Sequence, residues 1–294
     1  MADLAAGVEE YLFALTVERG LAANTLAAYR RDLNQYLEFL ARRTPETADL
    51  DRFVDHLDRR GLAPASVARK LAAVRGLHRF LVHEGHETQD PTRLLEHPRP
   101  RDPFPKALTI DQTVALVEAP DPATRVGRRD RALLEFLYAS GARVSEAVDL
   151  NLGDLDLEER TAFLTGKGDK QRLIPVGSKA VEAIFNWLPD RLEISRRGRD
   201  ADAVFLNLRG GRLSRQSVFR LVRHHAGRVG IAPATISPHT LRHSAATHMV
   251  EGGADLRSVQ VMLGHARIST TQVYTRVSPQ HLVEVFFLSH PRSR

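Results

Sequence analysis

The chain has 294 residues, 43% of them hydrophobic, with a formal net charge of +6 and an isoelectric point near 9.9. This length suits about two domains, and the positive charge favours a polyanionic partner such as nucleic acid. The absence of cysteine excludes disulfides, a thiol nucleophile and Cys-ligated zinc. We expect no signal peptide and no transmembrane helix, and hence a cytoplasmic protein without membrane association.

Residues 1–88 are predicted to form a helical domain. Apolar residues recur at helical spacing from Leu26 to Leu40 and from Val67 to Leu81, and the second helix is expected to end at Gly85. Several basic side chains lie off these apolar stripes and could contact phosphate or simply face solvent. They are Arg30, Arg31, Arg69, Lys70 and Arg75.

Residues 89–106 are predicted to be a linker because closely spaced prolines there exclude a continuous helix. Helical spacing resumes at Thr109 and is interrupted by two strand-like runs, Thr161–Leu164 and Arg172–Val176. The predicted fold class is therefore mainly α with a small β-sheet. It combines an N-terminal helical domain with a mixed α/β domain over residues 107–294.

The first candidate in chain order is Arg143. Gly141 is predicted to end an apolar helix and Arg143 to begin the next, with Glu146 as a possible partner or cap. Read alone, Arg143 is an ordinary surface arginine. Lys167 is flanked by glycines between the two strand-like runs, which predicts a hairpin tip. Its alternative is a solvated turn lysine.

The segment from Ser237 to His243 is the densest in polar side chains. Ser237 followed by Pro238 predicts a helix start, which places His239 and Arg242 on one face. Free backbone N–H groups and the helix dipole favour an anion there, and a guanidinium can bind two phosphate oxygens. An H-x-x-R pattern by itself is more often a polar helix start facing water.

Gly264 is predicted to end a helix directly before His265, and Tyr274 to lie on a short helix nine residues later. Such a tyrosine is usually a half-buried packing residue, since a free phenol is mostly protonated at neutral pH. With nearby cations or a base it becomes a nucleophile. The ordered set suggests phosphoryl transfer through a tyrosyl intermediate without a metal or cofactor. Its members are Arg143, Lys167, His239, Arg242, His265 and Tyr274.

This ordered set resembles the tyrosine recombinase (phage integrase) family and, within it, the Xer recombinases, with XerD a better match than XerC. The resemblance extends to Glu18–Thr25, Ala254–Arg257 and His290–Arg292, and so covers nearly the whole chain. It implies that residues 1–88 form a SAM-like core-binding domain for DNA. It also implies that residues 107–294 form the catalytic domain with a C-terminal tail.

The resemblance also implies a reaction. Tyr274 would attack a DNA phosphodiester to form a 3′-phosphotyrosyl link, Lys167 would protonate the leaving 5′-oxygen, and His239 would accept the tyrosyl proton. The phosphate would be stabilised by Arg143, Arg242 and His265. All six residues are present, so an active enzyme is expected.

The implied partners are double-stranded DNA at a core recombination site, a second Xer-type recombinase in a cyclic heterotetramer, and a DNA translocase as activator. The implied role is resolution of chromosome and plasmid dimers at a dif-like site. The run Phe286–Leu288 is expected to pack onto a neighbour in such a ring, its alternative being the chain's own domain.

Other functions remain open from the sequence. A type IB topoisomerase or a mobile-element integrase would share the nucleophile and its cations, whereas a non-cleaving DNA-binding regulator would not need them. Two histidine pairs, His83 with His86 and His224 with His225, lack the H-E-x-x-H pattern of zinc enzymes. They are expected at the surface or in a groove rather than on a metal.

Overall fold

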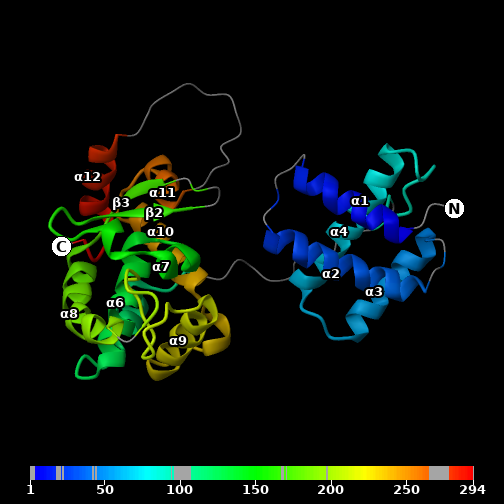
Figure 1. Cartoon of the computed structure of the whole chain (residues 1–294). Coiled ribbons are helices and arrows are strands. Elements are labelled where there is room, and N and C mark those ends of the chain that lie inside the picture. Colours follow the sequence, from blue (N-terminus) through cyan, green and yellow to red (C-terminus); the bar gives the residue numbers. More distant parts are fainter. Residues whose placement is uncertain are drawn as a thin grey trace. The chain divides into compact units, whose positions relative to one another are not determined.

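The computed structural model divides into two compact units, Met1–Phe104 and Pro105–Arg294 (Figure 1). The residues it describes are 4–17, 21, 23–41, 43, 45–93, 95, 107–166, 169, 171–196, 198–264 and 278–293. The predicted fold class is confirmed, since helices dominate both units and one small sheet lies in the second.

The first unit is a group of helices around one apolar core: α1 (Leu4–Val17), α2 (Ala23–Leu40), α3 (Thr47–Arg59) and α4 (Pro64–His83). Pro64 occupies the first turn of α4, where its missing N–H is not needed. Beyond the end of α4, Gly85 adopts a positive φ of 75°, as expected for a residue that follows a helix.

One of the basic residues expected to face outward lies inside this unit. Lys70 is only 4% exposed, and its Nζ donates to Asp32 at 2.7 Å and to Gln35 at 2.6 Å. This buried ion pair joins α4 to α2, and the carboxylate of Asp32 neutralises the charge of Lys70. The prediction of an outward-facing Lys70 is therefore wrong, whereas Arg69 next to it keeps a partly exposed side chain.

The second unit is built around α6 (Arg125–Ser140), which is almost entirely buried from Ala132 onward. It packs against α5 (Ile110–Glu118), α7 (Val144–Asp149), α8 (Ser178–Ser195) and α10 (Pro238–Glu251). The remaining helices are α9 (Arg215–Arg228), α11 (Leu256–Leu263), α12 (Pro279–Ser289) and the short 3₁₀ turns Leu152–Asp154 and Pro233–Thr235.

The sheet has the order β1-β2-β3, with β1 (Leu155–Asp156), β2 (Thr161–Thr165) and β3 (Gln171–Pro175) all antiparallel. The register pairs Thr165 with Gln171, the end of β2 with the start of β3, next to the connection between the two strands. Both predicted strands are therefore present. In Figure 1, β3 lies between the rest of the sheet and the region of α11 and α12, which it contacts.

The C-terminal segment packs on its own domain. Phe286 of α12 has 0% exposure, and its ring stacks on His290 at a centroid distance of 4.8 Å. Arg292 donates from Nε to Glu135 of α6 at 2.9 Å, in a contact buried from solvent. The expectation that the whole run Phe286–Leu288 faces a neighbour is wrong for Phe286, whereas Leu288 is 70% exposed.

The pair His224 and His225 was also expected at the surface. His225 is instead buried, and its Nε2 lies 2.9 Å from Asp130 Oδ2. A histidine on the apolar side of α9 can be buried because a carboxylate on α6 satisfies one ring nitrogen.

Of the helices that the structure describes, none is long and apolar enough to cross a membrane.

Phe286→Ala should destabilise the second unit by about 3–5 kcal/mol, because it removes a fully buried ring and leaves a cavity. Leu288→Ala, in the same helix turn but exposed, should change the free energy of unfolding by less than about 0.5 kcal/mol. Urea unfolding of the full chain, followed by Trp187 fluorescence in the second unit, measures both. Equal effects of the two variants would mean that α12 is not docked in solution.

Candidate active site

Three of the six candidate residues, Arg143, His239 and Arg242, lie among the residues that the structure describes. Lys167, His265 and Tyr274 lie outside them, so their predicted roles stay predictions. The described three occur at the starts of α7 and α10, where the chain turns into a helix.

Arg143 directly precedes α7, after Gly141 ends α6 with a φ of 57°. Its backbone N–H donates to Glu146 Oε2 and its Nη1 donates to Glu146 Oε1, each at 2.8 Å. Its Nη2 donates to the carbonyl oxygen of Gly264 at 3.0 Å. The side chain is thus held from both sides while remaining 38% exposed.

Arg242 lies one turn into α10. The start of this helix follows the prediction, since Ser237 is the N-cap, its hydroxyl accepts from the Thr240 N–H, and Pro238 is the first helical residue. The Arg242 guanidinium donates from Nη1 to the carbonyl oxygen of Gly141 and from Nη2 to that of Leu263, each at 2.6 Å.

The two arginines are therefore neighbours, although they are far apart in the sequence. They donate to adjacent carbonyls, those of Leu263 and Gly264, at the end of α11. Gly264 has a positive φ of 67°, which ends the helix and turns the chain back. The predicted helix end at Gly264 is confirmed.

Arg172 of β3 was not among the site residues predicted from the sequence. Its Nη1 and Nη2 donate to the two oxygens of Glu146 at 2.9 and 2.7 Å, and its Nε donates to the Met262 carbonyl oxygen at 2.9 Å. Its side chain is 16% exposed. Nothing near Arg172 in the sequence signals this role, because its partner Glu146 lies 26 positions earlier in the chain.

Electrostatics in this cluster are strongly coupled. Burial would raise the pKa of Glu146, but hydrogen bonds from Arg172 and Arg143 outweigh it and hold the pKa below its usual value. Burial, together with the neighbouring charges of Arg143 and Arg172, lowers the pKa of Arg242 to about 10. Arg242 stays protonated at neutral pH, so three guanidinium groups meet one carboxylate and positive charge is in excess.

His239 is the exposed member of the described candidates. It belongs to the first turn of α10, three residues before Arg242, and its ring lies edge-on to Phe219 of α9 at 6.2 Å between centroids. An exposed imidazole beside the free N–H groups of a helix start can exchange protons with solvent or substrate.

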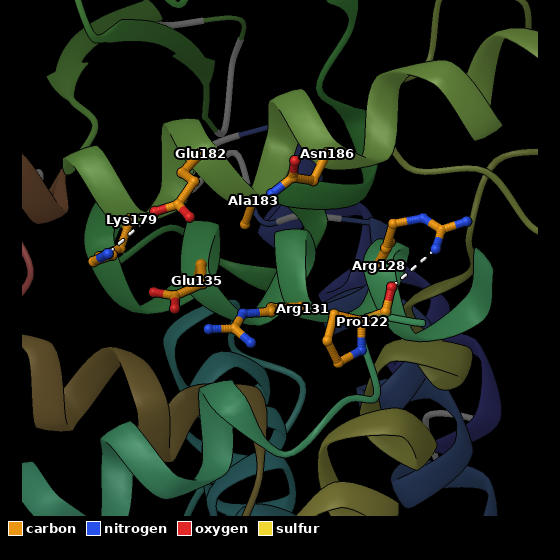
Figure 2. Close-up of a pocket in the computed structure, with 8 residues that line it drawn as sticks. All are labelled: Pro122, Arg128, Arg131, Glu135, Lys179, Glu182, Ala183 and Asn186. Carbon is orange, nitrogen blue, oxygen red and sulfur yellow. Dashed lines mark hydrogen bonds and ion pairs between the residues drawn. The ribbon is translucent and has the colours of Figure 1, made fainter. Parts of the chain in front are cut away.

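A separate cavity of about 370 Å³ lies between α6 and α8. Figure 2 shows its lining side chains, which come from these two helices and the loop at Pro122. Within it, Lys179 pairs with Glu182 at 3.1 Å. The other charged lining residues, Arg128, Arg131 and Glu135, pair with Asp190, Glu118 and Arg292, which do not line the cavity. None of Arg143, His239 and Arg242 lines it.

Over the described ranges, no group of three or more histidine, aspartate or glutamate side chains is arranged to hold a metal ion. Arginine side chains are the positive groups that the described part of the candidate site offers to an anion.

Comparison with known proteins gives matches over both units. Residues 106–281 match the phage integrase family, and residues 8–85 match the phage integrase N-terminal SAM-like domain. Tyrosine recombinase XerD of Mycobacterium tuberculosis is 47% identical, with all of both chains covered. Tyrosine recombinase XerC of Pelobacter propionicus is 45% identical, covering 100% of this chain and 98% of the relative.

A solved structure shares the fold. It is the XerH site-specific recombinase bound to a palindromic difH substrate, in a post-cleavage complex. The TM-score is 0.71 at 24% identity, with 92% of this chain and 81% of the other covered. At this identity the similarity describes the fold alone.

Glu146→Gln should destabilise the second unit by about 3–5 kcal/mol at pH 7, since it leaves the partly buried guanidinium groups of Arg143 and Arg172 without their carboxylate. The folded-state pKa of Glu146 is lowered, so its contribution is present above the unfolded value, about 4.3, and is lost as the pH falls further. The stability gap between wild type and variant should therefore narrow below about pH 4. Urea unfolding at several pH values measures it.

Glu158→Gln is the matched control, because Glu158 is exposed in the turn between β1 and β2. It should leave stability nearly unchanged at every pH. A gap for Glu146→Gln that stays constant from pH 7 to pH 3 would show that its carboxylate is not the charged partner of the arginines.

Proposed function

The chain belongs to the phage integrase family of tyrosine recombinases, and we propose that it is an Xer-type, XerD-like enzyme that cuts and rejoins DNA at one specific site. The observation that carries the proposal is the pairing of Arg143 and Arg242 at the end of α11. Two partly buried guanidinium groups with excess positive charge form a site suited to a phosphate.

The charge of this site suits the transition state better than the ground state. A phosphodiester carries one negative charge, and nucleophilic attack on phosphorus concentrates further negative charge on the non-bridging oxygens. Guanidinium groups already held in place stabilise that added charge without having to reorganise. Because the pKa of Arg242, though lowered to about 10, lies well above 7, this guanidinium keeps its charge at the pH of the cell.

The proposed reaction uses the family's nucleophile. The Tyr274 phenolate oxygen bonds to phosphorus while the bond to the 5′-oxygen breaks, which leaves a 3′-phosphotyrosyl link. His239 accepts the phenol proton, and Lys167 gives a proton to the 5′-oxygen, so a free 5′-hydroxyl leaves. The phosphate is held by Arg143, Arg242 and His265.

The reverse reaction joins new ends. Attack by a 5′-hydroxyl from the partner duplex displaces Tyr274 and restores a phosphodiester. The energy of the broken bond is kept in the phosphotyrosine, so no nucleotide cofactor is consumed. This balance explains how one active site can both cut and reseal.

We propose that the DNA site is dif-like and that the enzyme resolves chromosome and plasmid dimers. The proposal is supported by relatives named XerD and XerC at 47% and 45% identity. A second Xer-type recombinase in a cyclic heterotetramer and an activating DNA translocase complete the proposed assembly, in the cytoplasm. Residues 1–88 and 107–294 are the proposed core-binding and catalytic domains, joined by the linker 89–106.

Three alternatives differ in testable ways. A type IB topoisomerase needs no second duplex, and the match of residues 8–85 to the integrase SAM-like domain argues against it. A mobile-element integrase would act on two unlike sites instead of two copies of one. A non-cleaving regulator would never become covalently attached to DNA.

Tyr274→Phe should abolish covalent attachment while leaving DNA affinity within about twofold, since affinity comes mainly from backbone phosphates. The assay is a suicide substrate nicked next to the cleavage position, which traps the 3′-phosphotyrosyl complex as a slow band on a denaturing gel. EDTA in the buffer should not change the wild-type yield. An adduct formed by the variant would assign the nucleophile to another residue.

Lys167→Ala should slow cleavage of an ordinary substrate by about 10²-fold or more, because the leaving 5′-oxygen then lacks its acid. A substrate with a 5′-bridging sulfur should restore the rate, since a thiolate leaves without a proton. Arg143→Ala serves as the control, because loss of a phosphate contact should not be rescued by sulfur. Equal defects of Lys167→Ala on both substrates would remove Lys167 from the acid role.

A further inference from the structure

The end of α11 is held by three arginines from three different elements. Three successive carbonyl oxygens, those of Met262, Leu263 and Gly264, each accept a hydrogen bond from one guanidinium group. The donors are Arg172 of β3, Arg242 of α10 and Arg143 before α7.

A helix end has a physical reason to attract cations. Its last carbonyls have no partner within the helix and carry the negative end of the dipole, so guanidinium groups satisfy both the hydrogen bonds and the charge. At α11 the last carbonyl oxygens accept hydrogen bonds from guanidinium groups, and two of these, from Arg143 and Arg242, are also the proposed phosphate ligands. The position of the helix end and the orientation of the arginines therefore depend on each other.

Arg172 differs from the other two in how fully its donors are used. Nε, Nη1 and Nη2 all donate to protein acceptors, and the side chain is 16% exposed against 38% for Arg143. Its two bonds to Glu146 run parallel in the bidentate form that best fixes a guanidinium against a carboxylate. Arg172 is thus the least available to a ligand.

The guanidinium of Arg172 also lies directly against Gly264. A methyl group placed on Gly264 would meet Arg172 Cζ and Nη1 at 3.1 Å and Nε at 3.2 Å. Arg172 thereby touches the residue whose carbonyl holds Arg143 and which precedes His265 in the chain. Any other side chain at position 264 would strain the positive φ and displace this guanidinium.

We propose that Arg172 is a positioning residue for recombination, acting through Glu146 and the end of α11. It fixes the Glu146 carboxylate, which in turn orients Arg143, and it fixes the point at which the chain leaves α11 for His265. The inference rests on the proposed roles of Arg143 and His265 in phosphate binding. Arg172 itself does not touch the phosphate.

The first experiment compares Arg172→Ala with wild type in single-turnover cleavage of the nicked suicide substrate. Cleavage should be about 10- to 100-fold slower, as expected when supporting contacts let a catalytic group move by about 1 Å. Affinity for a half-site should change less than about twofold, because most phosphate contacts lie elsewhere. Arg172→Lys should fall between the two, since lysine keeps the charge but loses the bidentate geometry.

Arg191→Ala is the matched control for a purely structural role. Arg191 is also a buried arginine that donates to a carbonyl, that of Ala203, and it belongs to α8, away from the cluster. The two alanine variants are compared at a temperature where melting curves show both to be folded. Arg191→Ala should then cleave at the wild-type rate.

A substrate with a methylphosphonate at the cleavage position gives a second comparison, and its result does not depend on how much of the protein is folded. This neutral centre depends less on guanidinium groups, so the defect of Arg172→Ala should shrink on it. Equal defects on both substrates, or wild-type rates for Arg172→Ala on the ordinary one, would overturn the proposal. A wild-type enzyme that forms no covalent complex would instead overturn the proposed function.

A double variant separates positioning from direct contact. If Arg172 acts through Glu146, then Arg172→Ala combined with Glu146→Gln should be within about threefold of the slower single variant, because coupled residues are not additive. Defects that multiply would mean that Arg172 acts independently of Glu146, which would overturn its assignment as a positioning residue that acts through this carboxylate.

Discussion

The buried carboxylate of Glu146 is the interaction on which the candidate active site depends. It accepts four hydrogen bonds, two from Arg143 and two from Arg172. Without it, three guanidinium groups would lie together in a partly buried place, where like charges repel strongly. With it, the arginines can lie close enough together to act on a single phosphate. Their combined positive charge still exceeds the one negative charge of the Glu146 carboxylate.

The fold supplies this arrangement by bringing the ends of several helices and one strand together, and no single continuous element carries it. Arg143 precedes α7, Arg172 lies on β3, Arg242 is one turn into α10, and all three meet the last turn of α11. The buried helix α6 packs on both α7 and α10 and so fixes their starts relative to each other. Helix starts and ends expose backbone groups, which makes them natural points for charged side chains to converge.

Much of this could be predicted from the sequence because it is encoded locally. Gly141 and Gly264 mark helix ends, Ser237 and Pro238 mark a helix start, and the strand pair around Lys167 follows from two short runs. The burial of Lys70 and His225 could not, because each depends on a partner on a distant helix, and the burial of Phe286 depends on the core that the whole second unit forms. Arg172 was missed for the same reason, since nothing near it in the chain indicates that Glu146 lies opposite.

The excess of positive charge in the cluster has a consequence for how stability and function are linked. Burial and the charges of Arg143 and Arg172 lower the pKa of Arg242, which means that the folded protein holds this guanidinium at a cost in free energy. An anion between the arginines would remove part of that cost, so binding of the proposed phosphate and folding of this region would favour each other. Guanidinium groups that repel one another in the free site would be stabilised by a bound phosphate. The stabilisation would be largest when negative charge builds up on that phosphate in the transition state. The same charges that destabilise the free site would therefore stabilise the transition state, and Glu146 sets the balance by neutralising only one of the three.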